Sequence, residues 1–247
     1  MLKVDFNSCL SHVSLAIYDI MKINWSNIKK KAYSFLDPLI SFLIKMGLTP
    51  NAITVIGFVI TIFASAILIY GAEKGLRGSP QYITLFGMVL LLAGVFDMLD
   101  GQLARKTGQM TVFGAFFDSI IDRYSEMIMF FGIAYYLVSF DYFLSGIFSF
   151  FAMIGSIMVS YARARAEGLG YECKVGMMQR PERILLIGIS ALMYGLVYSI
   201  AGEFKIKTAG ILLFENISIF TIPIFILAIL TNYTAFQRIK HCRKIMK

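Results

Sequence analysis

The sequence has little charge for its size. Only 15% of its 247 residues are charged, 58% are hydrophobic, and the mean hydropathy is +0.73. An ordinary water-soluble domain carries about 25% charged residues, so lipid is the expected solvent. The polar stretches are short connections, which leaves no room for a separate soluble catalytic domain. Any chemistry must therefore lie within or beside a bundle of apolar helices.

The sequence is also poor in cysteine and lacks segments that would divide the chain. Its three cysteines have neither the spacing of a zinc site nor the even count of a disulfide framework, so we expect no role for Cys9, Cys173 and Cys242. The first 20 residues lack a continuous apolar core that ends in a cleavage site, so we expect no signal peptide. Repeats, low-complexity tracts and linkers are not apparent. We expect residues 1–247 to form a single membrane domain.

Long apolar runs predict membrane-spanning helices. A helix needs roughly 20 apolar residues to cross about 30 Å of hydrocarbon. Such runs predict six spans, at residues 53–72, 82–104, 112–140, 142–164, 183–200 and 217–235. Residues 22–46 mix hydrophobic side chains with a lysine triplet and Pro38, which favours a helix lying in the membrane interface over a further span. The predicted fold is an all-α polytopic membrane protein, with this interfacial helix before a six-span bundle over residues 53–235.

The net charge of +8 is distributed unevenly along the chain. Six crossings place both termini and the connections at 101–110 and 167–183 on one side of the membrane, and most Lys and Arg residues fall there. By the positive-inside rule this side faces the cytoplasm. Contact with anionic headgroups explains the charge better than nucleic-acid binding. We expect a multi-pass protein of the plasma membrane with its active site and both termini in the cytoplasm.

Four carboxylates lie inside the second and third predicted spans, where an unpaired charge is costly. Asp97 and Asp100 are three residues apart, and Asp118 and Asp122 are four apart, so each pair projects from one helix face. Carboxylates this close repel one another unless a cation lies among them. Oxygen ligands suit Mg²⁺, Mn²⁺ or Ca²⁺. The pattern predicts a divalent-metal site, with a proton relay or structural ion pair as the alternative for any single aspartate.

Small residues and one cation flank these acids. Gly101 and Ala104 follow the first pair, and Gly114 precedes the second. They permit close approach of a ligand to the backbone, although small residues also serve helix packing. Arg105 is suited to bidentate binding of a phosphate, with anchoring to lipid headgroups as its alternative.

Together these residues form one continuous pattern: Asp97-Met-Leu-Asp100-Gly101-Gln-Leu-Ala104-Arg105, eight further residues, then Gly114-Ala-Phe-Phe-Asp118-Ser-Ile-Ile-Asp122. The pattern resembles the complete signature of the CDP-alcohol phosphotransferases. It fixes eight residues within a 26-residue window, which makes a chance match improbable. The segment 47–54, Gly-Leu-Thr-Pro-Asn-Ala-Ile-Thr, resembles the family's entry to the first span. The six-span plan with an interfacial helix is also similar to the family's fold.

The resemblance implies an enzyme of phospholipid biosynthesis that transfers a phosphatidyl or archaetidyl group from CDP-diacylglycerol or CDP-archaeol to a small alcohol and releases CMP. Two divalent ions, usually Mg²⁺ or Mn²⁺, are implied to bind at Asp97, Asp100, Asp118 and Asp122. Asp122 is implied to be the general base as well. The implied CDP-lipid site comprises Gly101, Ala104, Arg105, Gly114, Asn51 and Thr54. Family members are usually homodimers.

Positive charge crowds the connection between the fourth and fifth predicted spans, which suits an anionic acceptor. The candidate ligands of an acceptor phosphate are Arg163, Arg165, Lys174, Arg180 and Arg183. Arg163 and Arg165 are two residues apart and point in different directions on a helix, and we select Arg165 to face the site. The run Arg-Ala-Arg-Ala-Glu, followed by Arg-Pro-Glu-Arg, resembles the branch of the family that uses inositol phosphate.

Other readings remain open. Glycerol phosphate is the main rival acceptor, whereas serine and unphosphorylated inositol would need fewer cations. The arginines also fit a role in headgroup anchoring or membrane topology. A small cation or proton transporter is the alternative of another class, but it predicts mid-membrane acids and internal repeats, and neither is apparent in this sequence.

Overall fold

The structure of this chain is a computed structural model that describes residues 36–77, 79–208 and 211–246. It divides the chain into two compact units, Met1–Leu48 and Thr49–Lys247. In the first unit, residues 36–45 are helical. They are the described part of the interfacial helix predicted over 22–46, and residues 22–35 lie outside the described part. That this helix lies in the membrane interface stays a prediction.

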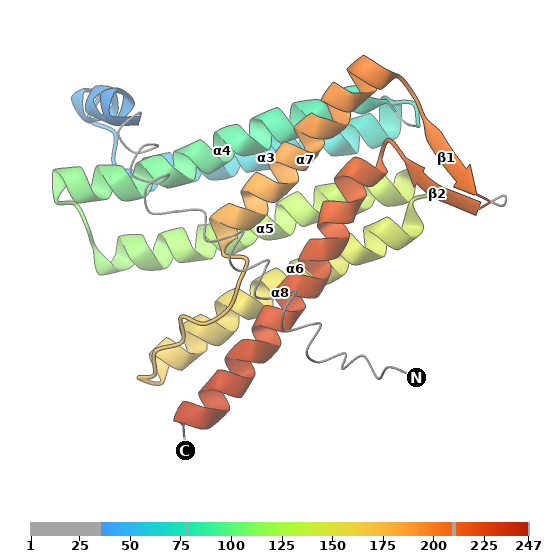
Figure 1. Cartoon of the computed structure of the whole chain (residues 1–247). Helices are drawn as coiled ribbons and strands as arrows, with labels where there is room; N and C mark the ends of the chain where they lie inside the picture. Colours follow the sequence, from blue (N-terminus) through green and yellow to red (C-terminus); the bar gives the residue numbers. More distant parts are fainter. Residues whose placement is uncertain (1–35, 78, 209–210, 247) are drawn as a thin grey trace. The chain divides into compact units, whose positions relative to one another are not determined.

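Six long helices make up most of the described part of the second unit (Figure 1). Their bounds are α3 Pro50–Lys74, α4 Pro80–Thr107, α5 Val112–Ser139, α6 Phe143–Gly168, α7 Arg180–Ala201 and α8 Ser218–Ile245. Each overlaps one of the six predicted spans. The ends agree to within a few residues, except that α8 continues well beyond the predicted end at residue 235.

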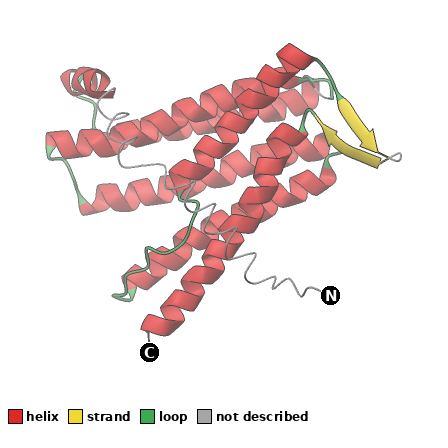
Figure 2. Cartoon of the chain, viewed as in Figure 1, coloured by secondary structure: helices red, strands yellow, loops and turns green. Residues whose placement is uncertain are grey.

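A feature that the all-α prediction missed is the antiparallel hairpin between α7 and α8 (Figure 2). It pairs β1 (Lys205–Thr208) with β2 (Ile211–Glu215). The strands are only four and five residues long, and so short a run carries too weak a periodicity to be distinguished from a loop. The hairpin lies at the end of the bundle opposite the C-terminus of α8 (Figure 1).

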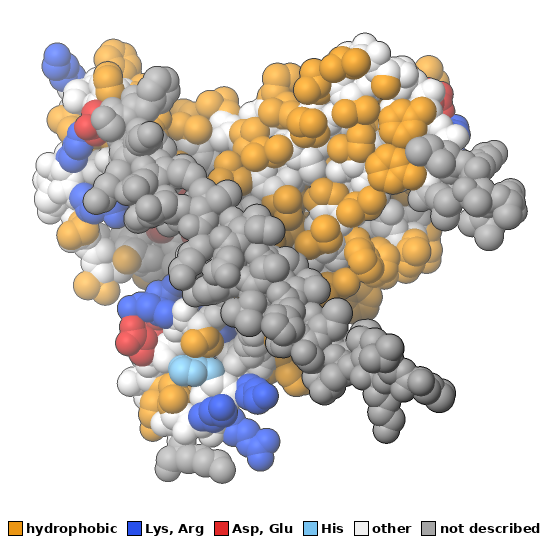
Figure 3. Space-filling model, in the orientation of Figure 1, with side chains coloured by type: hydrophobic (Ala, Val, Ile, Leu, Met, Phe, Trp, Pro, Cys, Tyr) orange, Lys and Arg blue, Asp and Glu red, His pale blue; other side chains and the backbone are white. Residues whose placement is uncertain are grey.

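Five of the described helices, α3, α4, α6, α7 and α8, are long and apolar enough to cross a membrane. Charged residues in the first half of α5 keep that helix outside the group. Large hydrophobic side chains face outward, as at Phe63 (60% exposed) and Phe131 (58%). In the view of Figure 3, hydrophobic side chains cover much of the surface toward the hairpin, and Lys and Arg gather around the C-terminal end of α8. These features are those of a multi-pass membrane protein.

The helices pack through small and hydroxylated residues. α3 packs against α4 and α5, α7 packs against α4, and α6 pairs with α8. The Ser65 hydroxyl donates to the carbonyl oxygen of Ile128 at 2.8 Å, which joins α3 to α5 by the kind of polar contact that membrane helices use. At Gly155, a Cβ atom would overlap the Thr231 hydroxyl. Glycine therefore allows the close approach of α6 and α8.

Local signals fix where the helices near the acids begin and end. The Thr49 hydroxyl accepts a hydrogen bond from the Ala52 amide at 3.3 Å, and Pro50 is the first residue of α3. Gly108 ends α4 with a left-handed φ of 66°. The Thr111 hydroxyl then accepts from the Gly114 amide at 2.9 Å and caps α5. The turn between the two aspartate pairs is therefore specified by sequence.

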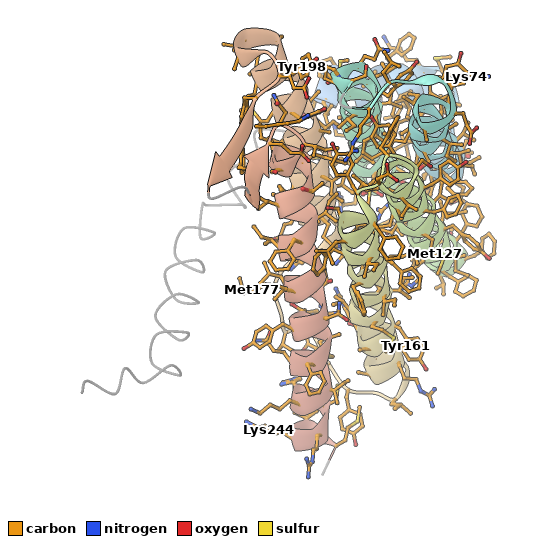
Figure 4. All side chains as sticks on the ribbon, turned by 90° about the vertical axis from the view of Figure 1, so that its right-hand side faces the viewer. Lys74, Met127, Tyr161, Met177, Tyr198 and Lys244 are labelled. Atoms are coloured by element: carbon orange, nitrogen blue, oxygen red, sulfur yellow. The ribbon has the colours of Figure 1, made fainter. Side chains whose placement is uncertain are left out.

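The connection between α6 and α7 turns back along α8. The Thr234 hydroxyl donates to the Met177 carbonyl at 3.1 Å, and Arg238 Nε donates to the Val175 carbonyl at 2.9 Å. Figure 4 shows Met177 between the two ends of the bundle, which Tyr198 and Lys244 mark. A capping box of Gln179 and Glu182 then starts α7. As a result α7 begins within the bundle, beside α4 and α5, rather than at its end.

Candidate active site

The aspartates of α4 and α5 converge. Asp97, Asp100 and Asp118 each offer a carboxylate oxygen, and these oxygens all lie within 4.8 Å of one another. Asp122 lies one helical turn after Asp118, and its carboxylate shares a cationic partner, Arg180, with Asp97. The two helix faces therefore meet as the spacing of the acids predicted.

Asp100 is held by hydrogen bonds to both of its carboxylate oxygens. The Thr54 hydroxyl of α3 donates to Oδ2 at 2.7 Å, and the Gly101 amide donates to Oδ1 at 2.5 Å. The Asp100 residue is only 6% exposed. Thr54, which we expected beside the nucleotide, thus also orients a carboxylate.

The acid cluster fits a divalent cation. Asp118 Oδ1 is buried and has no hydrogen-bond partner among the described residues. A buried acceptor without a partner is costly, and a cation among the three carboxylates would remove that cost. The donor set consists of oxygen atoms, as Mg²⁺ and Mn²⁺ prefer.

Arg180 supplies positive charge to the cluster. Its Nη1 pairs with the Asp97 carboxylate and lies 2.6 Å from Asp122 Oδ1. The guanidinium thus links α4, α5 and α7. The side chains are largely buried, at 17% exposed for Arg180 and 23% for each aspartate.

One cavity beside the acids, which we call the motif cavity, has a volume of about 220 Å³ and lies between α3, α4 and α5. Two of the four aspartates, Asp100 and Asp118, line it. So do all six residues expected to bind the CDP-lipid: Asn51, Thr54, Gly101, Ala104, Arg105 and Gly114. Gly101, Ala104 and Gly114 add no bulky side chain to its walls.

A second cavity, which we call the arginine cavity, has a volume of about 360 Å³ and lies between α5, α6, α7 and α8. Among the four aspartates, its described lining includes Asp122 alone. Five arginines and three carboxylates line it, so its net charge is positive. The arginines are Arg123, Arg163, Arg180, Arg183 and Arg238.

The arginines of this cavity are held in different ways. Arg183 is buried, donates to Glu126 Oε1 from Nε at 2.8 Å and to the Met178 carbonyl from Nη1 at 2.6 Å, and so joins α5 to the start of α7. Arg163 pairs with Glu167 at 2.8 Å and is about half exposed. The arginine cavity therefore combines a buried, fully hydrogen-bonded arginine on its inner wall with a half-exposed arginine at its rim.

The structure places some predicted acceptor residues at this cavity and others elsewhere. Arg163, Arg180 and Arg183 line it, whereas its described lining does not include Arg165 or Lys174. Arg165, the arginine that we selected, therefore stays a prediction. Lys174 instead pairs with the exposed Glu172.

Several lining residues escaped the sequence argument. Ser119 and Arg123 flank Asp122 and contact each other, since Arg123 Nη1 donates to the Ser119 hydroxyl at 2.9 Å. Arg238 comes from the far end of the chain. Its position just beyond an apolar run indicated only that it belongs with the Lys and Arg residues of the side assigned to the cytoplasm.

The amino-acid sequence matches one protein family over most of its length. The sequence model described as CDP-alcohol phosphatidyltransferase matches residues 47–231. The chain is 40% identical over 169 residues to a Pyrococcus horikoshii protein named archaetidylinositol phosphate synthase. That match covers 68% of this chain and 81% of the relative.

Solved structures show the same fold. Phosphatidylinositol phosphate synthase of Mycobacterium tuberculosis with CDP-DAG bound has a TM-score of 0.65 at 24% identity, covering 83% of this chain and 92% of that one. The same synthase in complex with manganese and citrate has a TM-score of 0.64 at 24% identity, with coverage of 83% and 87%.

Proposed function

Because this chain belongs to the CDP-alcohol phosphatidyltransferase family, we propose that it transfers a phosphatidyl or archaetidyl group from a CDP-linked lipid to inositol phosphate and releases CMP. The relative at 40% identity is named as a synthase of an inositol phosphate lipid. This supports inositol phosphate as the acceptor over glycerol phosphate, serine or inositol.

The observation that carries the proposal is the placement of the acids between two different cavities. Asp100 and Asp118 line the motif cavity, and Asp122 lines the arginine cavity. A donor in the first cavity and an acceptor in the second would meet at the carboxylates. Transfer between two bound substrates requires this kind of arrangement.

The donor would bind in the motif cavity. Gly101, Ala104 and Gly114 let the CDP moiety approach the helix backbones, and Arg105 would pair with its phosphate. Asn51 and Thr54 would border the nucleotide. The lipid tails would extend along the outward-facing apolar side chains.

The acceptor would bind in the arginine cavity. Its phosphate would lie against Arg163, Arg183 and Arg238, with Arg180 between the phosphate and the acids. Arg165 and Lys174 are candidates to attract the anion from outside this lining. A phosphorylated alcohol explains five arginines around one cavity better than a neutral one does.

Asp97, Asp100, Asp118 and Asp122 would hold two divalent ions, Mg²⁺ or Mn²⁺, which would stabilise negative charge on the pyrophosphate and on CMP as it leaves. Asp122 would accept the proton of the acceptor hydroxyl. The hydroxyl oxygen bonds to the phosphorus that carries the lipid, and the bond from that phosphorus to the oxygen of CMP breaks. The chain contributes positioning, charge and a base.

We further propose that residues 1–247 act as one membrane domain in which α5 crosses together with the other five long helices, with the N-terminal helix in the interface. The acids and both termini would face the cytoplasm of the plasma membrane, where CDP-lipid headgroups and soluble acceptors meet. As in other family members, the working form would be a homodimer.

The direct test is an assay of purified protein in detergent with Mg²⁺ or Mn²⁺ and a CDP-lipid. Inositol phosphate should give CMP and a phosphorylated lipid product, whereas glycerol phosphate, serine and inositol should give much less of both. EDTA should abolish the release of CMP, and added Mn²⁺ should restore it. Equal turnover with glycerol phosphate would overturn the assignment of inositol phosphate as the acceptor. Absence of CMP release with every acceptor would overturn the proposed reaction.

A further inference from the structure

Arg180 differs from the other arginines because it contacts the carboxylates that we assign to divalent ions. Its Nη1 pairs with Asp97 of α4 and lies 2.6 Å from Asp122 of α5. Asp97 also belongs to the three-carboxylate cluster that fits a cation. One carboxylate is therefore shared between a guanidinium and the ion-binding cluster.

The position of Arg180 is imposed by the fold. The connection before it is bonded to α8 through Thr234 and Met177. Three residues after it, Arg183 is anchored in a buried ion pair with Glu126. The chain is therefore anchored both before and after Arg180, and these two anchors hold Arg180 beside the acids.

Its guanidinium is less completely bonded than that of its neighbour. Arg183 has partners at Nε, Nη1 and Nη2. Arg180 Nε is buried but has no hydrogen-bond partner in the described part of the chain. Arg180 also lines the arginine cavity. The guanidinium thus has a free donor and an adjoining space into which it can turn.

We propose that Arg180 is a displaceable counter-charge of the acid cluster: it holds Asp97 and Asp122 together when divalent ions are scarce and competes with those ions for the same carboxylates. This rests on the proposed function only in assigning the acids to divalent ions. A cation beside the cluster reduces repulsion among the carboxylates but repels an incoming dication. Arg180 is therefore a positioning residue whose removal strengthens ion binding.

The test measures Mn²⁺ affinity, by calorimetry or by the electron paramagnetic resonance of free Mn²⁺, in detergent-purified protein without substrates. Arg180→Gln should bind Mn²⁺ about tenfold more tightly than wild type, which corresponds to about 1.4 kcal/mol. Arg180→Lys keeps the charge and should stay close to wild type. Arg163→Gln removes a cation that also lines the arginine cavity but pairs with Glu167, so it should leave Mn²⁺ affinity unchanged.

Unfolding supplies the second readout. In EDTA, Arg180→Gln should unfold at a lower temperature than wild type. Saturating Mn²⁺ should raise the unfolding temperature of the variant by more than it raises that of wild type. If this variant is unstable without ions, it can be purified with Mn²⁺ and challenged with excess EDTA, and it should release Mn²⁺ more slowly than wild type.

Equal or weaker Mn²⁺ binding by Arg180→Gln, or equally fast release, would overturn the proposal. That outcome is distinguishable from failure of the proposed function, because CMP release by the wild-type protein does not enter the measurement. Tight binding in both Gln and Lys variants would also count against it, since a role through charge requires that lysine restore the competition.

Discussion

The two cavities beside the acids differ in how their residues are distributed along the chain. The motif cavity is lined by two short segments, residues 50–54 and 100–118. The arginine cavity draws its lining from residues spread between Ser119 and Arg238 on four helices. A local signature thus specifies the first cavity, whereas the second depends on how the connection between α6 and α7 folds back along α8. Substitutions in the two cavities should therefore have separable effects.

The largest expected effect is at Asp122, the aspartate on the arginine-cavity side. Asp122→Asn removes the proposed base and should lower turnover by about 10³-fold. The loss should appear in CMP release far more than in CDP-lipid affinity, because the motif cavity is not lined by this residue. Asp141→Asn is the control, since its exposed carboxylate pairs with Arg77 in a different part of the chain. Turnover near the wild-type value in Asp122→Asn would rule out Asp122 as the general base.

The buried ion pair of Arg183 and Glu126 in the wall of the arginine cavity predicts a large loss of stability. Glu126→Gln leaves Arg183 with a buried, unpaired charge, and the free energy of unfolding should fall by about 3–5 kcal/mol. Unfolding in detergent measures the change. Glu172→Gln, which breaks the exposed pair with Lys174, should have no measurable effect. The double variant Glu126→Met, Arg183→Met should recover most of the stability but not acceptor binding. An equal loss of stability in Glu126→Gln and Glu172→Gln would contradict the prediction.

On the motif-cavity side, Thr54 offers a matched comparison with Thr61. Both residues are buried on α3, at 7% and 6% exposed. The Thr54 hydroxyl donates to Asp100 at 2.7 Å, whereas the Thr61 hydroxyl donates to a carbonyl of its own helix at 3.0 Å. Thr54→Val should weaken Mn²⁺ binding by about tenfold, and Thr61→Val should not change it. Identical affinities in the two variants would show that the hydroxyl does not support the metal ligand.

The same contrast explains what could be predicted from the sequence. The six long helices follow from apolar runs of membrane-spanning length, and all six predicted CDP-lipid residues line one cavity because they lie in two adjoining segments. The hairpin was missed because its strands are short. Nothing local indicated that Arg238 would reach the arginine cavity.

The cysteines show the same limit. From their spacing we expected no role for the cysteines, and that spacing did not indicate that the Cys242 sulfur lies 3.6 Å from that of Cys173, 69 residues away in sequence. The two thiols are free, and they approach because the connection containing Cys173 packs against the end of α8. Long-range placement of a loop depends on tertiary contacts such as that between Thr234 and Met177, which carry no local pattern.

The smallest expected effect distinguishes the two neighbouring arginines of α6. Arg163 lines the arginine cavity, and Arg165, two residues on, points in a different direction. Arg163→Ala should raise the KM for inositol phosphate about tenfold with little change in the KM for the CDP-lipid, as expected for a residue that contacts the acceptor alone. Arg165→Ala should raise the KM for inositol phosphate by only about twofold, because an exposed charge outside this lining attracts the anion without contacting it. Steady-state kinetics with each substrate varied in turn measure both values. The reverse order would place Arg165 at the acceptor, as the sequence favoured.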